Sequence, residues 1–338
     1  MSSIRAKAPG KLIISGEHSV LKNCPAIAMA VDLFATTTIS SHTPASVLFD
    51  LFNLGYKNSE PFSALRTLKN RIKNEYHGFL TGNHSIRNVI KKPFELLQYT
   101  ATNLLEAVKP TLDKGVRIHN KSEIPTGCGL GSSAAIIVST NYGLAKFFNL
   151  NISDQQAKDL ALEAENLQHG NSSGLDIHLS MYGGCVFLAD GNFHARPLSN
   201  LPLQIIQTGR PTASTGDCVS HSQKLLAANL CEKFQKTTEQ IDQALTTNDK
   251  KLLTKSIRAN HRLLCQLEVV PKKVQNFVKQ IEQLDCAAKI CGAGSISGDN
   301  AGVILVAGDV DISKILGQYQ YTKLTAKPEA DGARAVTV

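Results

Sequence analysis

The segment best suited to do chemistry is Pro125–Ala135, which reads PTGCGLGSSAA. Its glycines at 127, 129 and 131 let successive backbone amides converge, and two serines then open an apolar stretch that extends to about Phe148. Amides that converge at a helix N-terminus bind anions well, because the helix dipole adds partial positive charge there. The segment therefore predicts an anion-binding loop that leads into a helix.

Two common phosphate-binding motifs do not fit this loop. No Lys-Ser or Lys-Thr pair follows the glycines, which excludes a Walker P-loop. The spacing is GxGxG instead of GxGxxG, and no acidic residue follows at the distance that a dinucleotide site requires. The alternative, a loop whose glycines have no special purpose, is disfavoured by the dense run GLGSSAA.

The elements that must position this loop mix strands and helices. A capping box at Ser153 and Gln156 opens a helix that ends at Gly170. The pattern predicts strands over 6–8, 11–15 after a Pro9-Gly10 turn, 26–33, parts of 34–60, 115–120, 185–190, 203–208 and 301–308, and helices within 61–110 and 219–284, before a polar tail.

Composition changes near residues 195–203, so we predict domains at 1–197 and 198–338. Strands and helices occur in both halves without a regular βαβ repeat. This arrangement predicts an α+β protein of two lobes.

Charge and composition exclude several classes of function. Lys and Arg number 36 against 28 Asp and Glu, so the net charge of +8 favours an anionic partner. Nucleic acid is disfavoured because the basic residues form no run, Trp is absent and only 6% of residues are aromatic. The eight cysteines contain no CxxC pair and the ten histidines no HExxH, so no metal is expected on Cys or His.

Membrane and secretion signals are also missing. The N-terminal residues lack the apolar stretch of a signal peptide, and no run approaches the roughly twenty apolar residues that span a bilayer. We expect a cytoplasmic protein that does not bind membranes.

The glycine loop resembles the second signature of the GHMP kinases, a superfamily that includes galactokinases, homoserine kinases and mevalonate kinases. Its first signature, a Pro-Gly-Lys followed by Gly-Glu, is matched by Pro9-Gly10-Lys11 and Gly16-Glu17-His18. Two motifs in the expected order identify the chain as a member of this superfamily.

Further segments resemble the mevalonate kinase group over nearly the whole chain. These are GEHSVL at 16–21, ENLQHGNSSGLD at 165–176, TGRPTAST at 208–215 and NHRLLCQLEV at 260–269. Ser172 stands where the group has proline, and Ile177 where asparagine often follows the aspartate.

The resemblance implies a fold and an activity. The expected N-terminal lobe is similar to ribosomal protein S5 domain 2, and the expected C-terminal lobe is ferredoxin-like. The implied reaction is ATP- and Mg²⁺-dependent phosphorylation of the 5-hydroxyl of mevalonate, which gives 5-phosphomevalonate and ADP in the route to isoprenoids. A homodimer is left open.

The resemblance also implies roles for individual residues. Asp176 and Lys11 match the catalytic aspartate and its lysine, and Ser133 and Glu165 match the magnesium ligands. The nucleotide-binding positions are Pro125, Gly127, Gly129, Leu130, Gly131, Ser132, Ser133 and Ala134. The substrate-binding positions are Lys11, Glu17, His18, Asp176, Gly292, Ala293 and Gly294.

Each assignment has a simpler alternative. Glu165 lies away from the apolar stripe of its helix, so it could simply be a solvent-exposed residue without a role. Lys11 could be an ordinary surface lysine. Asp176 would cap the helix that follows it. His18 and His169 are read as packing or hydrogen-bonding residues instead of catalysts.

The third superfamily signature is altered. The usual consecutive glycines are replaced by Gly292-Ala293-Gly294-Ser295-Ile296-Ser297-Gly298. Ile296 cannot comfortably adopt a positive φ, so the loop is expected to be less mobile than a run of glycines.

Three alternatives remain for the function. A phosphomevalonate kinase or a mevalonate diphosphate decarboxylase-like enzyme would share the fold, but Lys11 argues against the decarboxylases, whose first motif lacks this lysine. A catalytically silent ligand sensor is disfavoured by the joint presence of Lys11, Ser133, Glu165 and Asp176.

Overall fold

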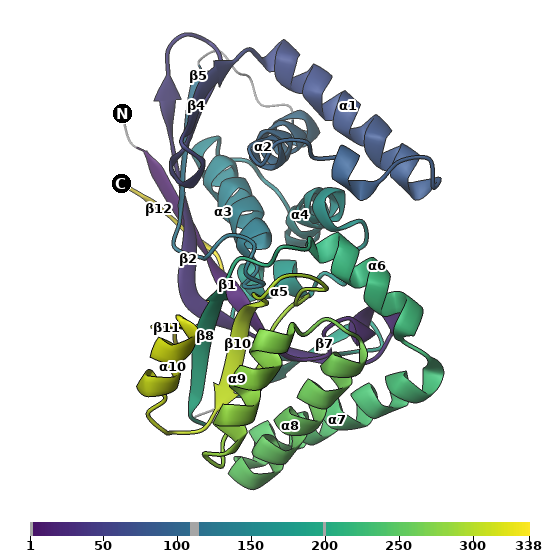
Figure 1. Cartoon of the computed structure of the whole chain (residues 1–338). Helices are drawn as coiled ribbons and strands as arrows, with labels where there is room; N and C mark the ends of the chain where they lie inside the picture. The colour runs from purple at the N-terminus through teal and green to yellow at the C-terminus, as the bar shows by residue number, and fades with distance from the viewer. Residues whose placement is uncertain (1–2, 109–114, 199–200) are drawn as a thin grey trace.

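The computed structural model describes residues 3–108, 115–198 and 201–338. Within these ranges the strands form one sheet of eight strands and one of four (Figure 1). The strands are β1 (Ile4–Ser15), β2 (Ala26–His42), β3 (Val47–Leu51), β4 (Tyr56–Glu60), β5 (Gly115–Ser122), β6 (Cys185–Ala189), β7 (Asn192–Arg196), β8 (Leu203–Gly209), β9 (Ala287–Ile290), β10 (Gly302–Ala307), β11 (Thr322–Leu324) and β12 (Arg334–Thr337).

The two sheets differ in connectivity. The larger sheet has the order β12-β1-β2-β5-β3-β4, and β6 and β7 extend from β2. Its pairs are antiparallel except β3 with β5, which is parallel. The smaller sheet is antiparallel with the order β11-β8-β10-β9.

Helices cover both sheets. They are α1 (Phe62–Leu80), α2 (Glu95–Val108), α3 (Ser132–Phe147), α4 (Asp154–His169), α5 (Leu175–Tyr182), α6 (Thr215–Leu225), α7 (Ala228–Thr247), α8 (Lys250–Gln266), α9 (Lys272–Glu282) and α10 (Ser313–Tyr319), with short 3-10 turns η1 (Ser19–Lys22), η2 (Phe52–Leu54) and η3 (Ile86–Asn88). Helix α3 packs on β1 and β2, α2, α4 and α5 pack around α3, and α8 and α9 pack on β9 (Figure 1). This two-lobed arrangement confirms the predicted α+β class.

The start of α4 shows how local sequence sets an element. Ser153 accepts a hydrogen bond from the Gln156 amide at 3.2 Å, and the Gln156 side chain accepts one from the Ser153 amide at 2.9 Å. The helix then continues to His169 and ends against Gly170, which has a φ of 84°. The predicted capping box and helix end are confirmed.

The predicted turn at Pro9-Gly10 is wrong. Strand β1 continues through these residues, and the irregularity appears as a register shift against β2 between Pro9 and Gly10. A proline donates no ladder hydrogen bond, so it fits such a bulge better than a regular strand position. A Cβ on Gly10 would lie 2.8 Å from the Leu130 carbonyl oxygen, so glycine here permits the close approach of the loop at 125–135.

The predicted polar tail also needs correction, because it contains α10, β11 and β12. Strand β12 pairs with β1 in the larger sheet, from Ile4 opposite Thr337 to Lys7 opposite Arg334. The strand lies at the edge of the sheet, where its last residues, Val336 and Thr337, are exposed. The boundary predicted at 197/198 falls between β7 and β8, where residues 199–200 lie outside the described residues, and it stays a prediction.

No helix within the described ranges is both long and apolar enough to cross a bilayer.

Candidate active site

The glycine loop adopts a conformation that requires its glycines. Gly127, Gly129 and Gly131 have φ values of 71°, 87° and 72°, in the left-handed region that other residues avoid. Gly131 is the N-cap of α3, which begins at Ser132. The predicted loop and helix are confirmed, and the free amides of the first turn of α3 lie where the loop ends.

Lys11 lies directly under this loop. Its backbone N–H donates to the Leu130 carbonyl at 2.9 Å, and a Cβ on Gly131 would lie 2.8 Å from its Cγ. Only 4% of Lys11 is exposed, so the alternative of an ordinary surface lysine is wrong. The long β1 strand carries the lysine into the interior and brings the first motif against the second.

Lys11 forms an ion pair with Asp176, with 3.2 Å between Nζ and Oδ2. Asp176 lies in the first turn of α5, but Gly174 is the N-cap and receives no side-chain cap hydrogen bond. The capping alternative for Asp176 is therefore wrong. Its side chain keeps 26% of its surface exposed, whereas that of Lys11 keeps 5%, so the carboxylate is the member of the pair that a ligand can reach.

Ser133, Glu165 and His169 form a second group at the start of α3. The Ser133 hydroxyl donates to Glu165 Oε1 at 3.0 Å, and His169 Nε2 lies 3.3 Å from the same oxygen and 3.4 Å from the hydroxyl. Glu165 is only 1% exposed, so its reading as a solvent-exposed residue is wrong. Helix α4 packs against α2, α3 and α5. These helices also cover the side of α4 that lies away from its apolar stripe, where Glu165 stands.

His169 belongs to this group although the sequence favoured only a packing or hydrogen-bonding role for it. Burial opposes its protonation, but the carboxylates of Glu165 and Asp176 outweigh burial and raise the pKa of His169, with Lys11 acting against them. The histidine thus lies in the electrostatic field of both carboxylates.

The donor set at Ser133 and Glu165 suits a hard cation. Glu165 Oε2 is buried and has no hydrogen-bond partner among the described residues, and neither does the hydroxyl oxygen of Ser132. Magnesium takes one or two protein oxygens and completes its shell with waters and phosphate oxygens, so one hydroxyl and one carboxylate suffice. The described residues contain no group of three or more His, Cys, Asp or Glu placed to hold a metal, and this donor set does not need one.

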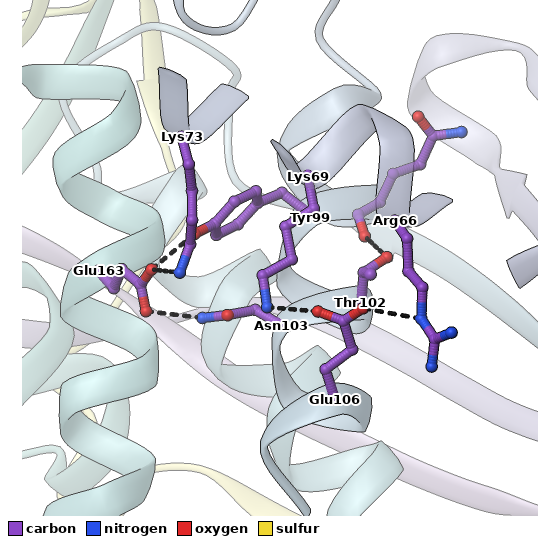
Figure 2. Close-up of polar contacts among 9 residues, drawn as sticks. Arg66, Lys69, Lys73, Tyr99, Thr102, Asn103, Glu106 and Glu163 are labelled. Atoms are coloured by element: carbon purple, nitrogen blue, oxygen red, sulfur yellow. Dashed lines mark hydrogen bonds and ion pairs between the residues drawn. The ribbon is translucent and has the colours of Figure 1, made fainter. Parts of the chain in front are cut away.

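A polar network holds the opposite face of α4 (Figure 2). Tyr99 donates to Glu163 at 2.6 Å, Asn103 donates at 2.9 Å, and Lys73 pairs with Glu163 at 3.0 Å. Burial opposes ionisation of Glu163, but these three donors lower its pKa. Glu163 and Glu165 lie on opposite sides of α4, so the network fixes the rotation of the helix that aims Glu165 at Ser133. Sequence reasoning missed these residues because they match no motif.

Glu17 and His18 are buried at the junction of the two sheets. Glu17 forms an ion pair with Lys289 of β9. His18 Nε2 donates to the Ala293 carbonyl at 3.1 Å and Nδ1 accepts from the Ser222 hydroxyl at 2.8 Å. Burial lowers the pKa of His18 to about 4, and Lys289 adds to the effect. The neutral ring therefore links the first motif to the third loop and to α6. The sequence analysis did not predict a role for Lys289, because the segment AAKI at 287–290 matches no functional motif.

The altered third loop packs against the second. A Cβ on Gly129 would lie 2.6 Å from the Cys291 carbonyl oxygen, and one on Gly292 would lie 3.1 Å from the Gly129 Cα. Gly294 also has a positive φ, of 65°, whereas Ile296 does not and is 39% exposed. The isoleucine is accommodated because it stands at a position that needs no left-handed backbone.

Comparisons with known proteins agree with this geometry. Residues 89–184 match the family of GHMP kinases N terminal domain. A curated "Mevalonate kinase" from Thermococcus sibiricus is 30% identical over 315 residues, which cover 86% of this chain and 86% of that protein.

Solved structures show the same fold. The Methanococcus jannaschii mevalonate kinase matches with a TM-score of 0.78 and 23% identity, covering 96% of this chain and 98% of that one. Lactococcus lactis galactokinase complexed with galactose matches with a TM-score of 0.76 and 17% identity, covering 98% and 95%. At these identities the structures establish the fold alone, and the sequence match over most of the chain establishes the family. The chain belongs to the mevalonate kinase group of the GHMP kinase family.

Proposed function

We propose that this protein transfers the terminal phosphoryl group of ATP to the 5-hydroxyl of mevalonate, giving 5-phosphomevalonate and ADP in the route to isoprenoids. It is a phosphotransferase with an alcohol group as acceptor. The observation that carries the proposal is the pair of Lys11 and Asp176, 3.2 Å apart directly under the glycine loop. The sequence matches support the choice of acceptor, because curated relatives that align with 86% of this chain are named mevalonate kinase.

In this proposal Asp176 orients the attacking hydroxyl and accepts its proton. The Asp176 carboxylate is the part of the pair open to a ligand, and Lys11 supplies positive charge beside it. Phosphoryl transfer is accelerated mainly by positioning and by charge stabilisation, so an ammonium next to the reacting oxygens is suited to the task.

The nucleotide would lie along the glycine loop and the N-terminus of α3. The backbone N–H groups of residues 126–134, which follow Pro125, would hold the phosphates, and Ser133 with Glu165 would hold Mg²⁺. Mg²⁺ bound with ATP supplies charge neutralisation at the phosphates. The buried and unpartnered Glu165 Oε2 supports this assignment.

On the substrate side, residues 292–294 and His18 would shape the pocket. The His18 ring binds the Ala293 carbonyl and so holds this loop beside the second one. Glu17 acts in this proposal through its buried pair with Lys289. A cytoplasmic location and a homodimer stay predictions from the sequence.

An ADP-release assay with mevalonate, phosphomevalonate, mevalonate diphosphate, homoserine and galactose tests the proposal. We expect turnover with mevalonate alone, and loss of turnover in the Asp176→Asn variant as a control for contaminating kinases. Turnover with phosphomevalonate or mevalonate diphosphate instead would move the protein to another branch of the family. Absence of turnover with ATP binding retained would indicate a ligand sensor.

A further inference from the structure

Arg210 lies against the outer end of the glycine loop. It follows β8, and its Nε is 3.5 Å from the position that a Cβ on Gly127 would occupy, with its Cγ at 3.9 Å. The side chain is exposed. Among the described residues, no carboxylate forms an ion pair with its guanidinium group.

Two other cations near the loop have carboxylate partners. Lys11 pairs with Asp176, and Lys289 pairs with Glu17. A nucleoside triphosphate carries several negative charges. Backbone amides and one divalent cation compensate only part of this charge. Arg210 is a cation close to the loop, and no carboxylate of the described chain forms an ion pair with it. Guanidinium groups bind phosphate oxygens in a bidentate manner.

Contacts of the smaller sheet with the loop position the strand end that precedes Arg210. The Gln207 amide donates to Cys128 Sγ at 3.7 Å, and a Cβ on Gly302 would lie 2.6 Å from the Cys128 carbonyl oxygen. Gly209, with a φ of 110°, directs the chain out of β8, and a Cβ there would lie 2.6 Å from the Asn300 side chain. These contacts hold the end of β8, which Arg210 follows, close to the loop.

We propose that Arg210 binds the phosphates of the nucleotide held by the glycine loop, so that the C-terminal half of the chain contributes a phosphate ligand to a site built mainly by the N-terminal half. This inference rests on the proposed function, because it assumes a nucleotide at residues 125–134. It adds a residue that no superfamily signature includes.

Calorimetric titration with ADP and with AMP tests the inference without turnover. Arg210→Gln should weaken ADP binding about tenfold, as expected for loss of a hydrogen bond to a charged group. AMP binding should change less, because fewer phosphates are present. Arg210→Lys should lie between, since it keeps the charge but not the bidentate geometry. The matched control is Arg5→Gln, which removes an exposed arginine from β1 and lowers the net charge equally.

The outcomes are separable. ADP affinity equal to that of the wild type and of Arg5→Gln would overturn the inference, with the proposed function intact if mevalonate is still phosphorylated. An unchanged ADP affinity with a higher KM for mevalonate would also overturn it, because Arg210 would then recognise the substrate carboxylate. A wild-type protein that binds no nucleotide would instead refute the proposed function.

Discussion

Lys289 and Glu17 form an ion pair that is shut off from solvent, with side-chain exposures of 0% and 1%. Lys289 belongs to β9 of the smaller sheet, and Glu17 follows β1 of the larger one. The pair therefore connects the two sheets next to His18, which binds the third loop at Ala293. Glu17 Oε2 has no hydrogen-bond partner in the described chain, so the carboxylate depends on the lysine for compensation.

Removal of one partner should be more harmful than removal of both. Lys289→Met leaves a buried carboxylate without its cation and should lower the free energy of unfolding by about 3–5 kcal/mol. The double variant Glu17→Leu with Lys289→Met should recover part of that loss, because no charge stays buried. Urea unfolding of both variants and of Glu17→Leu measures the coupling, and strictly additive losses would contradict it.

Asp176→Asn keeps the shape of the side chain but removes its ability to accept a proton. We expect kcat to fall by roughly 10²- to 10⁴-fold, with nucleotide affinity within a few-fold of the wild type. Steady-state kinetics together with ADP titration separate these quantities. A kcat close to the wild-type value would remove Asp176 from the catalytic role.

Ser133→Ala and Glu165→Gln should each raise the magnesium concentration that gives half-maximal rate, because each removes one oxygen ligand. The rate is measured against free Mg²⁺ at saturating ATP and mevalonate. A suitable control is Gln155→Ala, an exposed change on the same helix as Glu165. The ligand assignment fails if both titrations coincide with the wild type.

The third loop is held by the residues that replace its glycines. The Ser295 hydroxyl donates to the Ser297 carbonyl at 2.7 Å and accepts from the Ala213 amide at 3.3 Å. Replacing residues 295–297 with glycine should raise the conformational entropy of the open loop, which increases the free-energy cost of ordering it by about 0.4–1 kcal/mol per residue. The KM for mevalonate should rise, with a smaller effect on ATP binding. Ile296→Gly alone tests chain entropy without loss of these bonds, and unaltered constants in a folded triple variant would place the loop outside the site.

Acid should weaken the fold below the ordinary histidine pKa. Burial lowers the pKa of His18 and of His261 to about 4, against 6.5 in the unfolded chain. Between these pH values the unfolded state binds more protons than the folded state. The free energy of unfolding therefore decreases by about 1.4 kcal/mol for each histidine per unit by which the pH is lowered. Urea unfolding from pH 7 to 4.5 should show a shallower fall for His261→Gln than for the exposed His77→Gln on α1. Parallel curves would contradict the assignment.

Local sequence was sufficient for features whose cause is local. The left-handed glycines at 127, 129 and 131, the capping box at Ser153 and the helices with apolar periodicity follow from backbone sterics and short-range hydrogen bonds. For the same reason the motif residues could be named in advance, and the family recognised from them.

Tertiary structure decided everything that depends on contacts between distant segments. Glu165 is buried because α4 packs on three helices, although its own helix pattern placed it away from the apolar stripe. The pair of Glu17 and Lys289 joins residues 272 positions apart. Periodicity within one element records which face is apolar, but it carries no information about which other elements cover the remaining faces or which charges meet there.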